Sequence, residues 1–344
     1  MVITLSVTIY IPSSIFKQWN LLDEEILADA DGKKHPTTNS NIQSRFSTKY
    51  IGKGKGISIL SLVANHAVVN SKTIGLNEYE AHSLYDMIYG NNTDIIINNV
   101  TGDNHSLNPI NFVVLDSIDV RFLPSIKNLK DAANNIYSTK KTSDYTGLIT
   151  PKDQIKKSLI KSSKHQITRV LLSLILQKET QTTIVRKLST HDRYARLKAA
   201  LHECNKIFKS IHVLNMIDDI KLRKAIKAAR NRTESYHQLQ GAIRKVYHGI
   251  FKGRKIMDNN VSAHAVRLLA NCIITYNSFI LNILYERLVA AKAPQDLIDK
   301  FIRISPIAWD HLVFTGRYNF NKKDTTIDLE TMLNLLAERL KKGL

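Results

Sequence analysis

The sequence is poor in cysteine and has no long uninterrupted apolar run. Its two cysteines, Cys204 and Cys272, are far apart and form no Cys-x-x-Cys pair, which excludes a disulfide framework and argues against a thiolate zinc site. Free thiols suit a reducing cytosol, so we expect a cytoplasmic protein. The apolar opening segment, 1–16, lacks a basic region and a small-residue cleavage site, which argues against a signal peptide. The apolar stretch 266–284 contains Arg267 and several asparagines, which predicts a buried core helix and no membrane span.

Acidic residues are also in short supply. The chain has 30 Asp and Glu residues against 49 Lys and Arg residues, which gives a formal net charge of +19. A protein with this excess of positive charge attracts polyanions, and nucleic acid is the expected partner. The alternative is a ribosome-like or merely basic protein.

The first part of the chain has the pattern of an α/β fold. β-branched runs and helical spacings alternate up to about residue 128. We predict strands at 24–31, at 94–100 and at 119–126, two adjacent strands within 57–75, a loop or hairpin at 32–56, and helices at 77–89 and 108–117.

The second part of the chain predicts helices only. A polar stretch, 138–151, is the expected linker or exposed loop before them, and no further strand is expected after residue 128. The expected helices are 152–188, 192–214, 218–230, 234–252, 262–291 and 294–303.

Two aspartates follow predicted strands. Asp31 ends the first strand, and Asp103 lies just beyond the strand at 94–100. Strand ends are rigid places on which to mount metal ligands. Aspartates that form turns are equally common there, and Asp29 and Asp94 are rival acids that spacing alone does not exclude.

A single glutamate stands out in a basic segment. Glu234 is the only acid between Lys221 and Lys255, a window that holds eleven Lys and Arg residues, and we expect it to begin a helix with Thr233 as N-cap. An ordinary salt-bridge partner would give the same pattern. A metal ligand among phosphate-binding groups is the functional alternative. Three carboxylates can hold a pair of Mg²⁺ ions, which prefer oxygen ligands and which activate water and stabilise the leaving oxygen in phosphodiester cleavage.

Several stretches, taken in order, resemble one family. They are Ala30-Asp31-Gly32, KYIGKGKGI (49–57), VTGDNH (100–105), FLPSIKNL (122–129), NRTESYHQL (231–239), RLLANCIITYN (267–277) and ISPIAWDHLVFTGRYNF (304–320). Together they resemble the DDE transposases of the Tn-three family of replicative transposons, from about residue 25 to 321. The family has Ser where this chain has Ala30, Thr where it has Asn104, Gly where it has Thr233, and Arg where it has the lysines of GKGKG. None of these departures removes a ligand.

The resemblance implies a fold, a chemistry and partners. The implied fold is α/β, with a ribonuclease H-like mixed sheet, flanking helices, a large helical insertion and a helical C-terminal part. The resemblance makes Asp31, Asp103 and Glu234 the catalytic, metal-binding acids, with two Mg²⁺ ions that Mn²⁺ can replace. The implied activity is cleavage at the 3′ ends of a transposon and strand transfer into target DNA during replicative transposition. The implied partners are transposon-end and target DNA and a second copy in a synaptic homodimer, in bacterial cytoplasm at the nucleoid.

Family members are much longer, so we expect a truncated copy whose Met1 lies inside a longer protein. A non-catalytic DNA-binding remnant is the alternative function, and a free-standing ribonuclease H-like nuclease is a third. The expected divisions are a leader (1–20), the sheet part with both aspartates (21–137), a helical insertion (138–218), a helical part with Glu234 (219–323) and a helical tail (324–344).

Basic residues near these motifs are the candidates for DNA contact. The GKGKG lysines could approach phosphates, although a flexible hairpin tip would have the same composition. His237 shares a helix face with Glu234, and it is as well explained by packing. The predicted DNA-binding residues are Lys53, Lys55, Arg230, Arg232, His237, Arg244 and Lys245.

Overall fold

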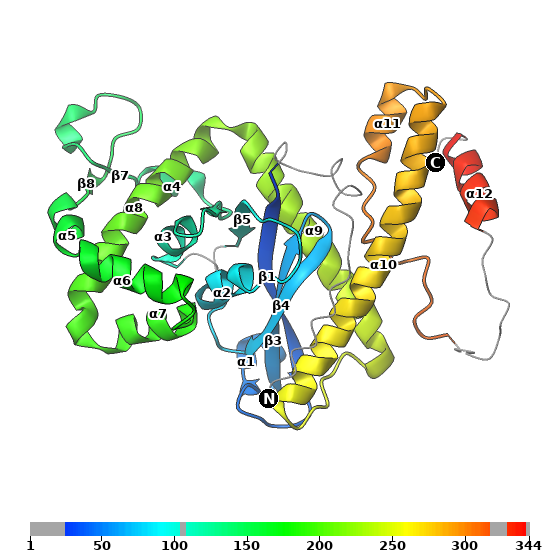
Figure 1. Cartoon of the computed structure of the whole chain (residues 1–344), viewed down its shortest axis with the longest axis horizontal. Coiled ribbons are helices and arrows are strands. Elements are labelled where there is room, and N and C mark those ends of the chain that lie inside the picture. Colours follow the sequence, from blue (N-terminus) through cyan, green and yellow to red (C-terminus); the bar gives the residue numbers. More distant parts are fainter. Residues whose placement is uncertain (1–24, 104–107, 317–328, 342–344) are drawn as a thin grey trace.

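A mixed β-sheet lies between two layers of helices (Figure 1). The structure is a computed structural model of the chain, and it describes residues 25–103, 108–316 and 329–341. The expected leader at 1–20 lies outside the described residues, as does part of the expected tail. The strands of the sheet are β1 (Leu27–Thr37), β2 (Arg45–Phe46), β3 (Lys55–Ala64), β4 (Ala67–Gly75), β5 (Asn99–Gly102) and β6 (Arg121–Phe122).

The sheet has an antiparallel half and a parallel half. The strand order is β2-β3-β1-β5-β6, and β4 also pairs with β3. β1, β3 and β4 form an antiparallel meander. β5 pairs parallel to β1, and β6 pairs parallel to β5. The two strands β1 and β5 therefore run in the same direction, toward the same edge of the sheet.

The first strand is longer than the sequence pattern indicates. The prediction placed its end at residue 31 and a loop or hairpin from residue 32, but β1 continues to Thr37. It is held in place by β3, which pairs with it from Ala28 opposite Ala64 to Thr37 opposite Lys55. Asp31 is therefore in the middle of a strand, and the expectation that it ends the strand was wrong.

Other strand predictions hold in outline. The pair expected within 57–75 is confirmed as β3 and β4. The strand expected at 94–100 is confined to 99–102, and the strand expected at 119–126 is confined to the two residues of β6. Two further short strands, β7 (Tyr137–Ser138) and β8 (Asp153–Gln154), pair in parallel, so the prediction of no strand beyond residue 128 was wrong.

One layer of helices covers the face of the sheet to which the even-numbered residues of β1 point. Ala28 and Ala30 are buried there with Leu60 and Leu62 of β3 in the largest apolar cluster. The helices on this side are α2 (Leu84–Tyr89), α3 (Asn111–Asp116), α6 (Lys164–Ile175), α7 (Gln181–Thr190) and α8 (Ala195–Asp218). The short elements α1 (Thr48–Ile51), α4 (Leu129–Ala133) and α5 (Lys157–Ser162) lie around the periphery.

The other layer consists of two long helices. α9 (Ile220–Arg244) and α10 (Ile256–Ala290) pack on β3 and β4 through a second apolar cluster, in which Tyr236 and Ile274 are fully buried. We predicted two helices where α9 is continuous. No proline or glycine interrupts residues 220–240, and buried side chains along the whole helix hold it on the sheet. Glu234 is therefore mid-helix, and the N-cap is Asp219, whose side chain accepts from the backbone N–H of Lys221 and Leu222.

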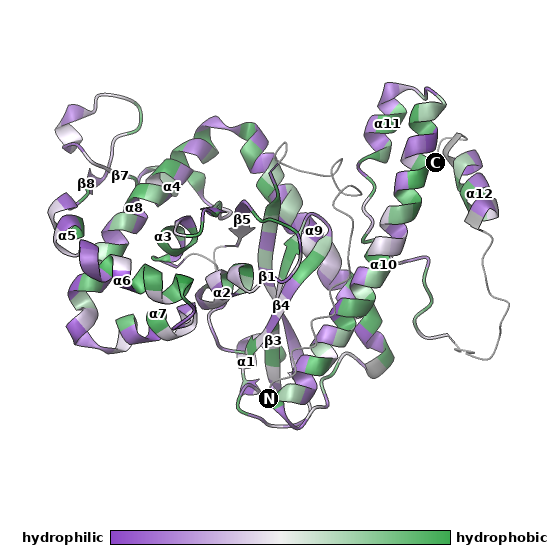
Figure 2. Ribbon diagram, viewed as in Figure 1, coloured by the Kyte–Doolittle hydropathy of each residue, from purple (hydrophilic) through white to green (hydrophobic). Residues whose placement is uncertain are grey.

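The apolar helix at the C-terminal side is buried on one face only. The prediction of a buried core helix at 266–284 was wrong for the other face, because Leu269, Tyr276 and Phe279 of α10 are each about half exposed. By length and composition α10 could cross a membrane, with 28% of its apolar window buried, but a single such helix is weak evidence. Its far end packs with α11 (Gln295–Phe301) and α12 (Leu329–Lys341), away from the sheet (Figure 2).

Candidate active site

The odd-numbered side chains of β1 face α9. Alternation along a strand places Asp29, Asp31, Lys33 and His35 on one face of the sheet. Each of them interacts with α9: Asp29 with Thr233, Asp31 with His237, Lys33 with the His237 carbonyl, and His35 with Gln240. A row of ionisable groups therefore lies between the strand and the helix.

His237 lies between two of the predicted acids. Its Nδ1 atom is 3.9 Å from Asp31 Oδ2 and 3.9 Å from Glu234 Oε2. These distances are too long for hydrogen bonds. Burial, with help from Lys33 and Lys34, lowers the pKa of His237 to about 3, so the ring is neutral at pH 7 and neither contact is an ion pair. The neutral imidazole therefore lies between the two carboxylates and adds no charge.

Asp103 reaches the same place from the neighbouring strand. Gly102, the last residue of β5, pairs with Ala30, so Asp103 follows directly beside Asp31. Burial raises the pKa of Asp31 to about 7, and the negative charges of Asp29, Glu80 and Asp103 add to the effect. The parallel pairing of β1 and β5 has thus gathered carboxylates that repel one another.

Asp29 is the most buried acid of the group. Its side chain is 1% exposed, and burial raises its pKa to about 6, although the Thr233 hydrogen bond and the charge of Arg230 lower it. Within the described residues its Oδ1 atom has no hydrogen-bond partner. Sequence patterns treated Asp29 only as a rival of Asp31, yet both face α9.

Glu234 is exposed, whereas Asp29 is buried and Asp31 is half-buried. Its side chain is 66% accessible to solvent, and it projects from the middle of α9. Lys33 lies close to it: the ammonium donates to the carbonyl of His237, and burial lowers the pKa of Lys33 while the charge of Glu234 raises it. Lys33 also crosses α9 at Gly241, where a Cβ atom would be 3.1 Å from its Nζ.

On the opposite face of β1 there is no room for a side chain at position 32, which accounts for the glycine that follows Asp31. A Cβ atom on Gly32 would lie 2.2 Å from Oε1 of Glu80, whose side chain occupies that space. Glu80 is buried, and it pairs with Lys34 and accepts from Ser58. The Gly32 N–H in turn donates to Asp31 Oδ1 at 2.9 Å.

The predicted DNA-binding residues do not form one cluster. Arg230 donates to Ser125, and Arg232 donates to Asn65 at the β3–β4 turn. His237 and Arg244 are buried, at 5% exposure each. Lys245 is exposed in the short 3-10 helix after α9.

Lys53 and Lys55 are exposed at the other end of the sheet from Asp31. Lys55 pairs with Thr37, whereas Asp31 pairs with Ser61, six positions further along β3 and about 20 Å away at the usual rise of a strand. Lys55 donates to Ser40. The structure therefore does not bring these two lysines to the carboxylates.

The acids match a hard divalent cation in chemistry but are not closed around one. Within the described residues, no group of three or more His, Cys, Asp or Glu side chains is arranged to hold a metal ion. The donors present are carboxylate oxygens, which suit Mg²⁺. Two observations fit a cation: the raised pKa values of Asp29 and Asp31, and the unpartnered Oδ1 of Asp29, because a positive charge would relieve both.

Sequence patterns missed Lys33, His35 and Glu80 as members of this region, and they named Asp29 only as a rival of Asp31. The alternation Asp29-Asp31-Lys33-His35 was visible, but it was hidden by assigning residues 32–56 to a loop. No local signal connects Glu80 to Gly32, because they meet only through the fold.

Comparison with known proteins gives a consistent result. A family model described as "Tn3 transposase DDE domain" matches residues 7–318. The transposase for transposon Tn1546 of Enterococcus faecium is 26% identical over 299 residues, 86% of this chain and 30% of that protein. The transposase for transposon Tn4556 of Streptomyces fradiae is 23% identical over 308 residues, 87% of this chain and 33% of that protein.

A third relative is the transposase for transposon gamma-delta of Escherichia coli (strain K12). It is 24% identical over 305 residues, 86% of this chain and 29% of that protein. The chain spans about a third of the length of these curated relatives.

Proposed function

The chain belongs to the Tn3 transposase DDE domain family, and on this premise we propose that it carries the metal-dependent centre for DNA cleavage and strand transfer in replicative transposition. The observation that carries the proposal is the pairing of β1 with β5, which sets Asp31 and Asp103 side by side, opposite Glu234 and His237 on α9. Phosphoryl transfer on DNA is the reaction that such a set of carboxylates serves.

Asp31, Asp103 and Glu234 would hold the metal, as two Mg²⁺ ions that Mn²⁺ can replace. When bound, these ions activate the attacking oxygen and stabilise the leaving oxygen of the phosphodiester. Asp31 and Asp103 are fixed by adjacent strands, so they would set the position of the site. Glu234 is exposed on α9 and would complete it from the helix.

Neighbouring side chains have supporting roles in this proposal. The neutral ring of His237 keeps Asp31 and Glu234 apart without offering a competing positive charge. Lys33, held by the His237 carbonyl, places a cation beside Glu234, where a DNA phosphate would lie. Water would attack first at the transposon end, and the freed 3′-OH would then attack target DNA.

The proposed fold is the ribonuclease H-like fold. The support is topological: three antiparallel strands in a meander, then two strands parallel to the first on its other side, with helices on both faces. We propose the domain divisions 21–137, 138–218 and 219–323 for the same chain. The last boundary coincides with the junction between α8 and α9.

DNA is the proposed partner, at transposon ends and at the target, with a homodimer in the synaptic complex and a bacterial cytoplasmic location at the nucleoid. The net charge of +19 favours binding to a polyanion. Lys53, Lys55, Arg230, Arg232, His237, Arg244 and Lys245 remain the proposed DNA contacts. Among these, the exposed residues Lys53, Lys55 and Lys245 are best placed for phosphates.

The decisive experiment is strand transfer by a protein of full family length that contains this chain. Asp31→Ala, Asp103→Ala and Glu234→Ala should each lower the rate at least about a hundredfold, since loss of even an outer-shell partner typically costs 10–100-fold. Asp94→Ala is the matched control, because Asp94 is an exposed acid near the same strand. Full activity of Asp103→Ala would refute the assignment.

A non-catalytic DNA-binding remnant is the second candidate. The exposure of Glu234 favours it, because this carboxylate is not drawn into a ligand cluster. Calorimetry with Mg²⁺ and Mn²⁺, together with nicking of plasmid DNA by the 344-residue chain, separates the two functions. Metal binding without nicking would favour the remnant, and nicking that Asp31→Ala abolishes would favour the enzyme.

A further inference from the structure

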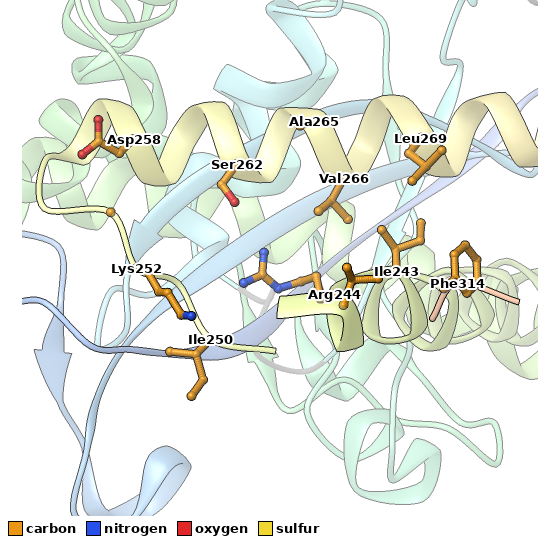
Figure 3. A pocket seen from close by; sticks show the side chains of 12 residues that line it. Ile243, Arg244, Ile250, Lys252, Asp258, Ser262, Ala265, Val266, Leu269 and Phe314 are labelled. Carbon is orange, nitrogen blue, oxygen red and sulfur yellow. The ribbon is translucent and has the colours of Figure 1, made fainter. Parts of the chain in front are cut away.

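A cavity of about 660 Å³ opens between the C-terminal end of α9 and the first half of α10 (Figure 3). This is within the usual size of a small-molecule site. The apolar part of its wall includes Ile243, Val266, Leu269 and Phe314. Figure 3 shows the guanidinium of Arg244 reaching toward the space between the two helices. The cavity thus combines an apolar wall with a buried cation.

Within the described residues, Arg244 forms no ion pair with a carboxylate. Its side chain is 5% exposed, and its guanidinium lies over the ring of Phe251, 3.5 Å from the centroid. Burial lowers its pKa to about 10, with no acid acting to raise it. Within the described residues its Nε atom lacks a hydrogen-bond partner. A buried guanidinium in this state is stabilised when an anion enters the cavity.

The platform beneath Arg244 is fixed. Phe251 bridges to the end of β1, where its N–H donates to the Pro36 carbonyl and its carbonyl accepts from Thr38. The rings of Phe251 and His35 are also in edge-to-face contact, with their centroids 5.5 Å apart. The guanidinium therefore occupies a position that β1 determines, as the catalytic carboxylate of Asp31 does.

Of the described residues that line the cavity, one is acidic, and its carboxylate already accepts hydrogen bonds. Asp258 accepts through Oδ2 from the backbone N–H groups of Arg254 and Lys255, at 3.1 and 3.0 Å, at the start of α10. Lys252 also lines the cavity, and Ser262 offers a hydroxyl that points toward Arg244 in Figure 3. Because Arg244 and Lys252 outnumber Asp258, the charged side chains in the lining carry a net positive charge.

The position of the cavity connects it to the carboxylates. Arg244 is ten residues beyond Glu234 on the same helix, which corresponds to about 15 Å. Lys33 lies between them across Gly241, and its charge acts on His35 together with that of Arg244. A DNA strand advances about 3.4 Å per nucleotide, so the separation corresponds to about four nucleotides.

We propose that this cavity receives one unpaired nucleotide of the DNA, with its phosphate on Arg244 and Lys252 and its base against the apolar wall. The inference rests on the proposed function, because it places the phosphate under reaction at Asp31 and Asp103. An anionic group joined to a flat apolar body fits the two ends of the cavity. The phosphate of a mononucleotide from solution has the same chemistry, and the experiment below separates the two sources.

Fluorescence anisotropy of short labelled duplexes tests the proposal on the whole chain. Three duplexes are compared: fully paired, with one unpaired thymidine, and with an abasic residue in place of that thymidine. The unpaired thymidine should bind about tenfold more tightly than either control, because stacking of one base is worth this much. Equal affinity for all three duplexes would overturn the proposal.

Two variants locate the effect. Ala265→Trp fills the cavity from its exposed rim and should abolish the preference, while affinity for paired DNA stays within about twofold, since rim substitutions on exposed helices are nearly neutral. Arg244→Gln should also abolish it. Ala290→Trp, an exposed alanine at the far end of the same helix and outside the cavity, is the matched control and should keep it. A preference that survives in Ala265→Trp would contradict the assignment.

Thymidine monophosphate tests the source of the nucleotide. If the free nucleotide binds by calorimetry more tightly than the unpaired thymidine in DNA, and Ala265→Trp removes this binding, the cavity serves a soluble nucleotide and the strand is the wrong ligand. Failure to bind any duplex would overturn the proposed function together with the inference. Salt-dependent binding of paired duplex without the preference would overturn the inference alone.

Discussion

Replacing Gly32 by alanine should destabilise the protein, because the added methyl group would collide with a buried carboxylate beside β1. The added Cβ would lie 2.2, 2.4 and 2.7 Å from Oε1, Cδ and Oε2 of Glu80. The Glu80 carboxylate is confined, because it is buried, pairs with Lys34 and accepts from Ser58 at 3.4 Å. Either Glu80 moves and loses these contacts, or β1 moves away from Glu80 and toward α9.

The expected cost follows from these two alternatives. Overpacking a dense core by one methyl group destabilises by about 1–3 kcal/mol, and losing a hydrogen bond to a charged group costs about 1.5–3 kcal/mol. Lys34 is partly exposed, so water replaces some of its lost contact. We therefore expect Gly32→Ala to lower the free energy of unfolding by about 2–3 kcal/mol, within the range that both terms allow.

Urea unfolding followed by circular dichroism measures this change. Gly147→Ala is the matched control, because a Cβ there meets nothing within 4 Å, and its stability should be unchanged or raised by up to about 1 kcal/mol. In the double variant Gly32→Ala/Glu80→Ala the cost should fall below the sum of the single changes by about 1 kcal/mol or more, because the two sites are in contact.

The reasoning fails if Gly32→Ala is no less stable than Gly147→Ala, or if the Gly32 and Glu80 changes add without coupling. Activity gives a second measure. The Gly32 N–H orients Asp31 through its 2.9 Å hydrogen bond, so movement of β1 should also slow strand transfer. A destabilised but fully active Gly32→Ala protein would show that Glu80, and not the strand, had moved.

Three further predictions concern the turn beside α9, the buried histidine and the DNA. Asn65 has a φ of 57° and accepts from Arg232 at 2.6 Å, so Asn65→Ala should cost about 1–3 kcal/mol in thermal or urea unfolding, while Asn65→Gly, which keeps the backbone conformation, should cost less. Burial lowers the pKa of His35 to about 3, so the unfolded chain takes up the proton first. His35 therefore contributes stability that is lost as the pH falls from 6.5 toward 3, at up to about 1.4 kcal/mol per unit. The urea midpoint should change less with pH in His35→Gln than in the unaltered protein across this range. An equal dependence on pH would refute the effect. Burial raises the pKa of Asp29 to about 6, so the folded protein takes up this proton before the unfolded chain does. Asp29 therefore adds stability as the pH falls from 6 to 3.8. Finally, the logarithm of the DNA association constant should fall linearly with the logarithm of salt concentration, and Lys53→Ala with Lys55→Ala should reduce the slope by about 0.9 for each lost phosphate contact.

Much of the fold could be predicted because its signals are local. The β-branched runs of β3 and β4 are visible in the sequence and were placed within a few residues. Several helices of the C-terminal part, among them α8, α10 and α11, also follow from their periodicity, whereas the single helix expected at 152–188 is divided into α5, α6 and α7. The errors arose where pairing or packing overrides local preference. β1 passes through Gly32 and Pro36 because β3 is paired with it, and α9 passes through Asn231 and Thr233 because its buried side holds it on the sheet.

The sequence by itself determined the family, through the order of its motifs, and it named Asp31, Asp103 and Glu234 as candidates. Motifs and charge counts are properties of a string, so they need no coordinates. Only the tertiary structure decided that Asp29, Lys33 and His35 share the face of Asp31, and that Glu80 fills the space beside Gly32.

The same division applies to the basic residues. Sequence alone treats Arg244 and Lys55 as equivalent cations. The fold buries Arg244 over Phe251 at the wall of a cavity and leaves Lys55 exposed at the end of β3. The physical reason is that burial and charge pairing depend on segments far apart in the chain: β1 meets α9 across some two hundred residues, and no local pattern specifies that contact.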